Sequence, residues 1–262
     1  MLQRWRIKFV GAPSARVKWC LNGRKWFAMN RLRPFLSFML KPEHLQEVMP
    51  LLPADKAALY APLLAKWCER YEMANPVTLA MFLAQVAEES GQMLRWRENM
   101  NYSSPARLVA VWPSRFTLET AKAYVNQPQK LGNYVYGGRL GNVEPMDGWN
   151  YRGGGLLQAT GREMYAKLAA TVGRELGIDF VAEPHRITEP EAGIAAACWI
   201  WAVEKGLNEI SQAKDKVVIR FRGQRVSLPP FTAVTRLING GETNLKSRLA
   251  YWKTAKRVLG VE

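Results

Sequence analysis

From Pro42 onward the chain is a series of helix-forming segments, and this pattern limits the fold more than any other feature. Apolar residues recur at helical spacing, and Pro, Gly or Asn marks the gaps. The segments predicted as helices are 42–49, 54–71, 76–90, 118–126, 161–172, 190–205 and 244–259. The stretch 216–226 alternates around Gly223 and predicts a small exposed hairpin. We therefore expect a mainly α domain with a long loop-rich middle over 99–155, a length that usually carries function.

Glu89 ends the apolar segment 76–90 and is the first candidate for chemistry. On a helical wheel it falls within about 20° of Phe82, at the margin of the apolar stripe, whereas Glu88 points away from that stripe. A carboxyl at the border of an apolar face is partly desolvated, which favours the protonated form that a general acid needs.

Glu98 follows nine positions later and forms a pair with Glu89 only if the helix stops between them. A continuous helix would hold the two about 13.5 Å apart on opposite faces. Gly91 and the polar tract 99–105 supply a break. Two carboxyls that face each other across this break could flank a glycosidic bond. Inverting glycoside hydrolases hold their two catalytic carboxyls roughly 6.5–9.5 Å apart, which leaves room for a water. The alternative is that both glutamates are solvent-exposed residues at a helix end and have no catalytic role.

The glycine-rich segment 147–162 is the second informative stretch. Its glycines allow a ligand or another backbone to come close. Gln158 and Thr160 are two apart, so in an extended chain both would face one side and could orient a sugar or a water. The spacing of a phosphate-binding loop is absent, and a structural turn is the alternative interpretation.

Asn239, followed by two glycines, offers a donor and an acceptor that suit N-acetyl and hydroxyl groups, although Asn-Gly is also a common turn. Arg248 could pair with a catalytic carboxylate; a surface arginine is the alternative.

Charge divides the chain into a basic extension, 1–38, and the remainder, 39–262. The net charge is +15, and the extension carries nine basic residues and no acidic one, with aromatics between them. Such a segment could engage anionic lipid or nucleic acid. The alternative is a disordered extension, or one created by a start codon assigned too early, with Met39 as the true first residue.

Cys20, Cys68 and Cys198 are odd in number and far apart, which favours free buried thiols over a disulfide framework. His44 and His185 lack metal-ligand spacing, so no metal is expected. No apolar run approaches the ~18 residues of a membrane span, and no signal peptide is apparent. We expect the protein to accumulate in the cytoplasm of its producer until something else releases it.

Taken in order, these motifs resemble the catalytic domain of glycoside hydrolase family 19, and within it the bacteriophage endolysin branch. The similarity runs from about Pro42 to Gly260. Its motifs are at 82–90, 98–103, 139–142, 148–162, 199–201 and 238–241. None is decisive alone, but their ordered set is specific.

The resemblance implies a lysozyme-like, two-lobed α-helical fold around a saccharide groove. It implies that Glu89 is the general acid and Glu98 the general base, and that Thr160 helps to hold the attacking water. The groove would be lined by Tyr151, Gln158 and Asn239, and Arg248 would support the acidic pair. Hydrolysis of a β-1,4-linked N-acetylhexosamine chain would then proceed with inversion and without a cofactor.

The sequence departs from the family pattern at three positions. Glu88 stands where a histidine usually precedes the acid, Gly154 replaces a commonly basic residue, and Met164 takes the place of an asparagine that contacts substrate. These departures bear on substrate detail and activity more than on fold.

The polymer we favour is bacterial peptidoglycan, because a basic protein gains more on an anionic wall than on neutral chitin. We expect a monomeric endolysin that lyses the host cell after reaching the periplasm. We expect residues 1–38 to contact anionic lipid of the outer membrane, and no specific nucleic acid to be bound. The rivals are a chitinase, a lytic transglycosylase with a single acid, and a basic wall- or nucleic-acid-binding protein without activity.

Overall fold

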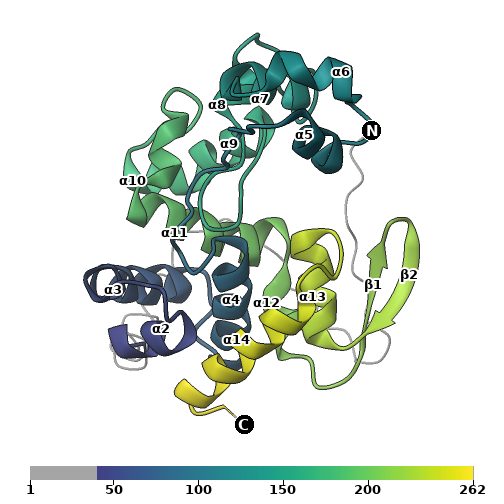
Figure 1. Ribbon diagram of the computed structural model, residues 1–262. Helices are drawn as coiled ribbons and strands as arrows, with labels where there is room; N and C mark the ends of the chain where they lie inside the picture. Colours follow the sequence, from purple (N-terminus) through teal and green to yellow (C-terminus); the bar gives the residue numbers. More distant parts are fainter. Residues whose placement is uncertain (1–39, 262) are drawn as a thin grey trace. The chain divides into compact units, whose positions relative to one another are not determined.

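The computed structural model describes residues 40–261, so the expectations for 1–38 and for Cys20 lie outside it. The described chain forms two compact units. One comprises the residues up to Glu88 and those from Trp201 onward, and the other runs from Glu89 to Ile200. Within 40–261 every element is helical except one two-stranded hairpin (Figure 1). The predicted fold class, mainly α with a small hairpin, is confirmed.

The first unit contains the longest helices. Its elements are α2 (Pro42–Val48), α3 (Ala54–Arg70), α4 (Pro76–Glu89, whose last residue starts the second unit), the π-helical turn η5 (Ile200–Glu204, whose first residue ends the second unit), α12 (Leu207–Gln212), β1 (Val217–Phe221), β2 (Gln224–Leu228), α13 (Pro230–Asn239) and α14 (Leu245–Val258).

Helix α4 is the centre of this unit. Every residue from Thr78 to Ala87 is buried, so the helix is enclosed on all sides rather than amphipathic with one solvated face. The Phe82 ring meets Trp201 edge-on at 5.4 Å. Polar residues of α4 therefore need partners inside the unit, and Gln85 finds one in Thr235 of α13, at 2.9 Å.

The hairpin lies where the sequence predicts it. Strands β1 and β2 pair antiparallel from Val217↔Leu228 to Phe221↔Gln224, which leaves Arg222 and Gly223 as a two-residue turn. Both turn residues have positive φ, +48° and +84°, as the tight turns of two-residue hairpins require.

The second unit is built from shorter elements. They are α5 (Pro105–Val111), α6 (Leu118–Ala121), η2 (Lys122–Tyr124), α7 (Pro128–Tyr136), α8 (Asp147–Asn150), α9 (Arg162–Leu168), the π-helical turn η3 (Ala169–Gly173), α10 (Arg174–Leu176), η4 (Pro184–Thr188) and α11 (Pro190–Trp199). The middle of the chain is loop-rich as expected, but it also holds α5, α7 and α8, which periodicity did not indicate.

Two groups of apolar side chains stabilise the second unit. The first joins α5, α6 and α7 and consists of Met100, Leu108, Phe116, Ala121, Leu131 and Val135, with aromatic rings around it. The second surrounds α11, where every residue from Ala192 to Trp199 is buried. Loops anchored between two such packed groups can hold side chains in fixed positions.

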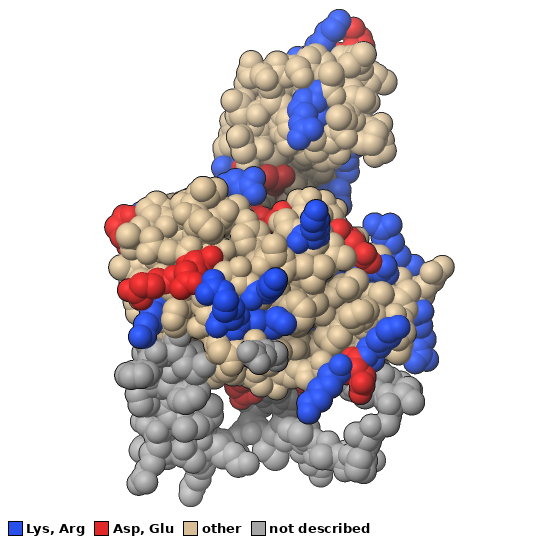
Figure 2. Space-filling view, turned by 60° about the horizontal axis from the view of Figure 1, so that its bottom comes forward, with Lys and Arg blue, Asp and Glu red and all other residues tan. Residues whose placement is uncertain are grey.

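Cys68 and Cys198 are buried thiols outside any disulfide, as predicted. No described helix is both long and apolar enough to cross a membrane. Between Lys214 and Arg257, a stretch that contains the hairpin, α13 and most of α14, the sequence carries eleven basic and two acidic residues. Figure 2 shows Lys and Arg side chains in several separate groups on one face, with Asp and Glu between them.

Candidate active site

Glu98 lies on a short two-segment ribbon within the second unit. Arg97 and Gly154 form an isolated antiparallel bridge. The Glu98 amide donates to the carbonyl of Gly153 at 2.8 Å, and the Gly155 amide donates to the carbonyl of Trp96 at 2.9 Å. The backbone around Glu98 is therefore fixed by the glycine-rich segment that the sequence singled out.

The carboxylate of Glu98 is held by two donors. The Tyr136 hydroxyl donates to both carboxylate oxygens, at 2.8 and 3.0 Å, and the Gly153 amide donates to Oε2 at 3.1 Å. Burial and the adjacent Glu98 charge raise the pKa of Tyr136 well above its usual value. Tyr136 thus stays a neutral donor, and the carboxylate keeps one orientation.

Gly153 and Gln158 complete the surroundings of Glu98. A Cβ on Gly153 would lie 2.5 Å from Oε1 of Gln158 and 3.3 Å from Oε2 of Glu98, so a larger residue there would displace the Gln158 side chain and crowd the Glu98 carboxylate. Gln158 has φ +52° and donates through Nε2 to the Gly155 carbonyl at 3.0 Å. The expected extended chain from Gln158 to Thr160 is wrong, because Gln158 lies in a turn.

Thr160 and Tyr151 differ in accessibility. Thr160 is half-buried and donates its hydroxyl to the Gln158 carbonyl at 2.9 Å, which leaves its oxygen able to accept from a water. Tyr151 is only 3% exposed and donates to the carbonyl of Val181 at 2.8 Å. A direct contact of Tyr151 with substrate stays a prediction, and its burial does not favour it.

Glu89 is the last residue of α4 and is half-buried. The predicted break after it is confirmed: Gly91, Gln92 and Met93 all have φ near +60°. The Ser90 hydroxyl accepts from the Met93 amide at 2.7 Å and fixes this turn. The chain therefore leaves the helix axis between the two glutamates.

Asn239 and Arg248 belong to the first unit. Asn239 is half-buried and ends α13, where Gly240 caps the helix with φ +75°. Arg248 is 2% exposed, so the surface-arginine interpretation is wrong. Its Nη1 donates to Oε1 of Gln85 at 2.6 Å and its Nε to the carbonyl of Thr243 at 3.1 Å.

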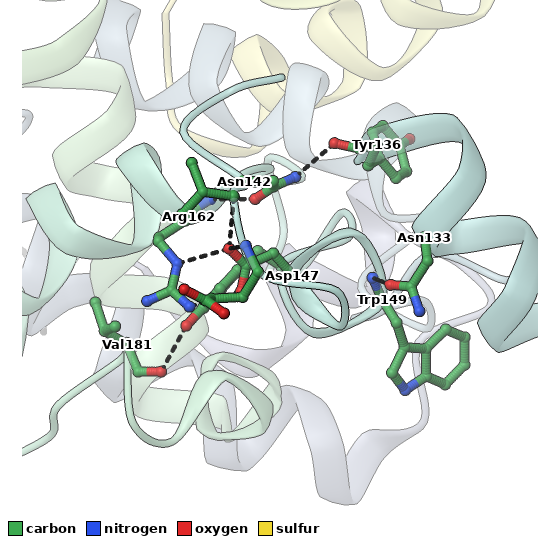
Figure 3. A network of polar contacts seen from close by, with 10 residues as sticks. Asn133, Tyr136, Asn142, Asp147, Trp149, Arg162 and Val181 are labelled. Carbon is green, nitrogen blue, oxygen red and sulfur yellow. Dashed lines mark hydrogen bonds and ion pairs between the residues drawn. The ribbon is translucent and has the colours of Figure 1, made fainter. Parts of the chain in front are cut away.

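A polar network behind Tyr136 was not predicted (Figure 3). The buried carboxylate of Asp147 accepts from Nε and Nη2 of Arg162, at 2.8 and 2.6 Å, and from the amides of Val143 and Glu144. These bonds, the Arg162 guanidinium foremost, lower the pKa of Asp147. Asn142 links the network to the Tyr136 carbonyl and the Arg162 amide. The network therefore fixes the end of α7, where Tyr136 lies.

Gly154, one of the departures from the family pattern, has a structural reason. A Cβ there would lie 2.5 Å from the Tyr165 hydroxyl and 2.9 Å from Nη1 of Arg97. The Arg97 guanidinium thus occupies the space that a side chain at position 154 would enter. Of the other two departures, Met164 lies half-buried on α9, and Glu88 accepts hydrogen bonds from Asn244 and Ser247.

Sequence reasoning missed Tyr136, Asp147, Arg97 and Arg152. The signal available for Tyr136 was an aromatic residue directly before two glycines and the 139–142 motif. Asp147 opens the glycine-rich segment, where a carboxylate at the first turn of a short helix is a common capping choice. For Arg97 and Arg152 the only signal was their position beside Glu98 and Gly153.

Comparison with known proteins assigns a family through one relative. No family model matches the chain. A glycosyl hydrolase family 19 domain-containing protein of Haemophilus influenzae is 31% identical over 191 residues, which cover 71% of this chain and 82% of that protein. Among solved structures, chitinase C of Streptomyces griseus aligns at 18% identity with a TM-score of 0.49, covering 86% of this chain and 94% of that one. A class IV chitinase of Zea mays aligns at 20% identity with a TM-score of 0.41, covering 71% and 70%. On the extent and identity of the Haemophilus match, the chain belongs to glycosyl hydrolase family 19.

Proposed function

We propose that this glycosidase hydrolyses β-1,4 bonds between N-acetylhexosamines of bacterial peptidoglycan, with inversion at the anomeric carbon. Glu89 is the general acid and Glu98 the general base. The observation that carries this proposal is the fixed carboxylate of Glu98, which accepts from the Tyr136 hydroxyl and the Gly153 amide. A base that must take a proton from one water needs such an orientation.

Thr160 supports the same mechanism. Its hydroxyl proton is engaged by the Gln158 carbonyl, so the oxygen is available to accept from the water that Glu98 activates. Glu89 would protonate the leaving glycosidic oxygen, and the water would attack from the opposite face of the sugar ring. No step requires a cofactor.

The basic surface supports peptidoglycan over chitin. The excess of basic residues between Lys214 and Arg257 adds to the net charge of +15. A positive surface concentrates a protein on an anionic polymer and gains little on a neutral one. We propose an endolysin role, in which the protein reaches the periplasm late in infection and 1–38 contacts anionic lipid of the outer membrane.

The hydrolase is tested with purified peptidoglycan and chitin hexamer as substrates. We expect wild type to release new reducing ends from peptidoglycan, and mass spectrometry to show hydrolysed rather than anhydro ends. Glu89→Gln and Glu98→Gln should each lower kcat by at least about 100-fold. The matched control is Glu163→Gln, an exposed glutamate on α9.

Each contrary outcome has a distinct meaning. Equal rates for Glu98→Gln and wild type would remove Glu98 from its role. Anhydro ends would select a lytic transglycosylase, and cleavage of chitin alone would select a chitinase. For the extension, deletion of residues 1–38 should preserve hydrolysis of purified wall and reduce lysis of intact Gram-negative cells; unchanged lysis would contradict that part.

A further inference from the structure

A pocket of about 520 Å³ lies in the second unit, beside the ribbon that carries Glu98. Arg97, Arg152, Trp149 and His185 line it, but Glu98 and Gly153 do not. Successive side chains of an extended segment point to opposite faces. Glu98 therefore faces Tyr136, whereas its neighbour Arg97 faces Tyr165, at 2.8 Å.

The two guanidinium groups of this pocket donate hydrogen bonds to neutral oxygens. Arg97 donates to the Tyr165 hydroxyl and to the carbonyls of Pro184 and Asn150, at 2.8, 3.1 and 2.6 Å. Arg152 donates to the carbonyls of Trp149 and Glu98, at 2.8 and 3.4 Å. Among the described residues that line the pocket none is acidic.

Two like charges close together in a partly buried site are unfavourable without an anion. Burial, and then the charge of Arg97, lower the pKa of Arg152 to about 10. Arg152 nevertheless stays cationic at neutral pH. The pocket therefore keeps two positive charges and has no acidic residue in its lining. The Glu98 carboxylate attracts Arg152 electrostatically, but Tyr136 and Gly153 hold it outside that lining.

The walls of the pocket also contain apolar surface. The Arg152 guanidinium lies 3.5 Å from the centroid of the Trp149 ring, which fixes the plane of its fork. Ala182 and Pro184 complete the lining beside Thr188. A planar fork next to an indole and small aliphatic groups suits a carboxylate carried on a short aliphatic chain. The volume is far larger than a single water or simple ion needs.

We propose that this pocket binds the free carboxylate of a peptide branch of the glycan substrate. The inference rests on the proposed function, because peptidoglycan carries carboxylate-bearing peptides and chitin carries none. It deepens that function by assigning substrate selection to Arg97, Arg152 and Trp149.

The first test measures binding by the wild-type protein. Calorimetry would compare N-acetyl-D-alanyl-D-alanine with its C-terminal amide and with inorganic phosphate. We expect saturable binding of the carboxylate form and at least about tenfold weaker binding of the amide, since charge-assisted bonds are lost. Equal binding of acid and amide, or no binding of either, would overturn the proposal. Binding of phosphate in place of the peptide would overturn its peptide part.

The second test uses Arg152→Gln, with the exposed Arg174→Gln of α10 as matched control. The readout is the ratio of kcat/KM on glycan with its peptides to kcat/KM on the same glycan stripped of peptides by an amidase. We expect Arg152→Gln to lower this ratio about tenfold, and Arg174→Gln to leave it unchanged. An unchanged ratio in a folded Arg152→Gln protein would contradict the proposal.

Failure of the two proposals is distinguishable. If the peptide carboxylate binds at the pocket but wild type releases no sugars from either glycan, the hydrolase assignment fails and the pocket stands. If hydrolysis proceeds equally on both glycans and the carboxylate probe does not bind, the pocket assignment fails and the hydrolase stands.

Discussion

Helix α4 and the segment from Tyr136 to Arg162 are held in place by different forces. Helix α4 is regular and apolar, and its residues from Thr78 to Ala87 are all buried. The other segment has only the single helical turn α8, and the carboxylate of Asp147 takes four of its hydrogen bonds.

The difference shows how stability and positioning are divided in this protein. An enclosed apolar helix contributes through surface removed from water, which any well-packed side chain of the right size can supply. A segment held by a buried carboxylate depends on particular hydrogen-bond donors, so the loss of one donor or acceptor atom can change its conformation. Substitutions in the buried part of α4, from Thr78 to Ala87, should therefore act mainly on stability. Those between 136 and 162 should act on stability, pH response and activity.

The largest effect should come from Phe82→Ala in α4. The side chain is fully buried against Trp201, so its removal should lower the free energy of unfolding by about 3–5 kcal/mol. Urea denaturation measures it. The exposed Leu59→Ala of α3 is the control and should cost below about 0.5 kcal/mol. A loss below about 1 kcal/mol for Phe82→Ala would show that α4 is not the packed centre of its unit.

Asp147→Asn should come next, with a loss of about 2 kcal/mol at neutral pH, because the charge-assisted bonds to Arg162 weaken. The folded pKa of Asp147 lies below its unfolded value. Its stabilisation is therefore complete above the unfolded pKa, near pH 4, and is lost as the pH falls through the folded pKa. Wild type and Asp147→Asn should converge in stability as the pH is lowered from 7 toward about 3.

The control for this pH response is Glu144→Gln, an exposed carboxyl three residues before Asp147. It should keep the wild-type dependence of stability on pH. If the free energies of unfolding of Asp147→Asn and wild type differ by a constant amount between pH 7 and about 3, the Asp147 carboxylate is not the source of the pH dependence of stability.

The sequence predicted the long helices well because their apolar residues form sustained periodic patterns. Helix α3 was expected over 54–71 and runs from Ala54 to Arg70, and α14 was expected over 244–259 and runs from Leu245 to Val258. Helices α5 and α7 were missed, since each is under ten residues long and too short for a period to show. Their start signals, Pro105 and Pro128 at the first helical position, were present.

The candidate site could be predicted only as a set of segments. The motif around Glu98 and the glycine-rich segment do pair, through the Arg97 bridge to Gly154. Tyr136 could not be assigned to Glu98, because 38 positions separate them and no local pattern encodes such a contact. The burial of Arg248 was likewise hidden, since its partner Gln85 is 163 positions away.

Tyr136→Phe should affect activity more than stability. The variant removes the hydroxyl that donates to both oxygens of Glu98 and leaves the ring in place. We expect kcat on peptidoglycan to fall about tenfold to a hundredfold with KM nearly unchanged, because the base loses its orientation. The free energy of unfolding should change by less than about 1 kcal/mol. Tyr134→Phe, an exposed tyrosine on the same helix, is the control.

Glu88→Gln should have the smallest effect and gives the sharpest form of the comparison. Glu88 is a polar residue of α4, as Asp147 is of the other segment, but its carboxylate accepts from Asn244 and Ser247 in an exposed position. Water can replace these donors, and Gln keeps one acceptor oxygen, so the loss should be about 0.5 kcal/mol. Urea denaturation of Glu88→Gln and Asp147→Asn at the same pH and temperature compares their free energies of unfolding. If Glu88→Gln loses as much free energy of unfolding as Asp147→Asn, burial of the carboxylate does not determine how much these hydrogen bonds stabilise the protein. The contrast between α4 and the segment from Tyr136 to Arg162 would then be wrong.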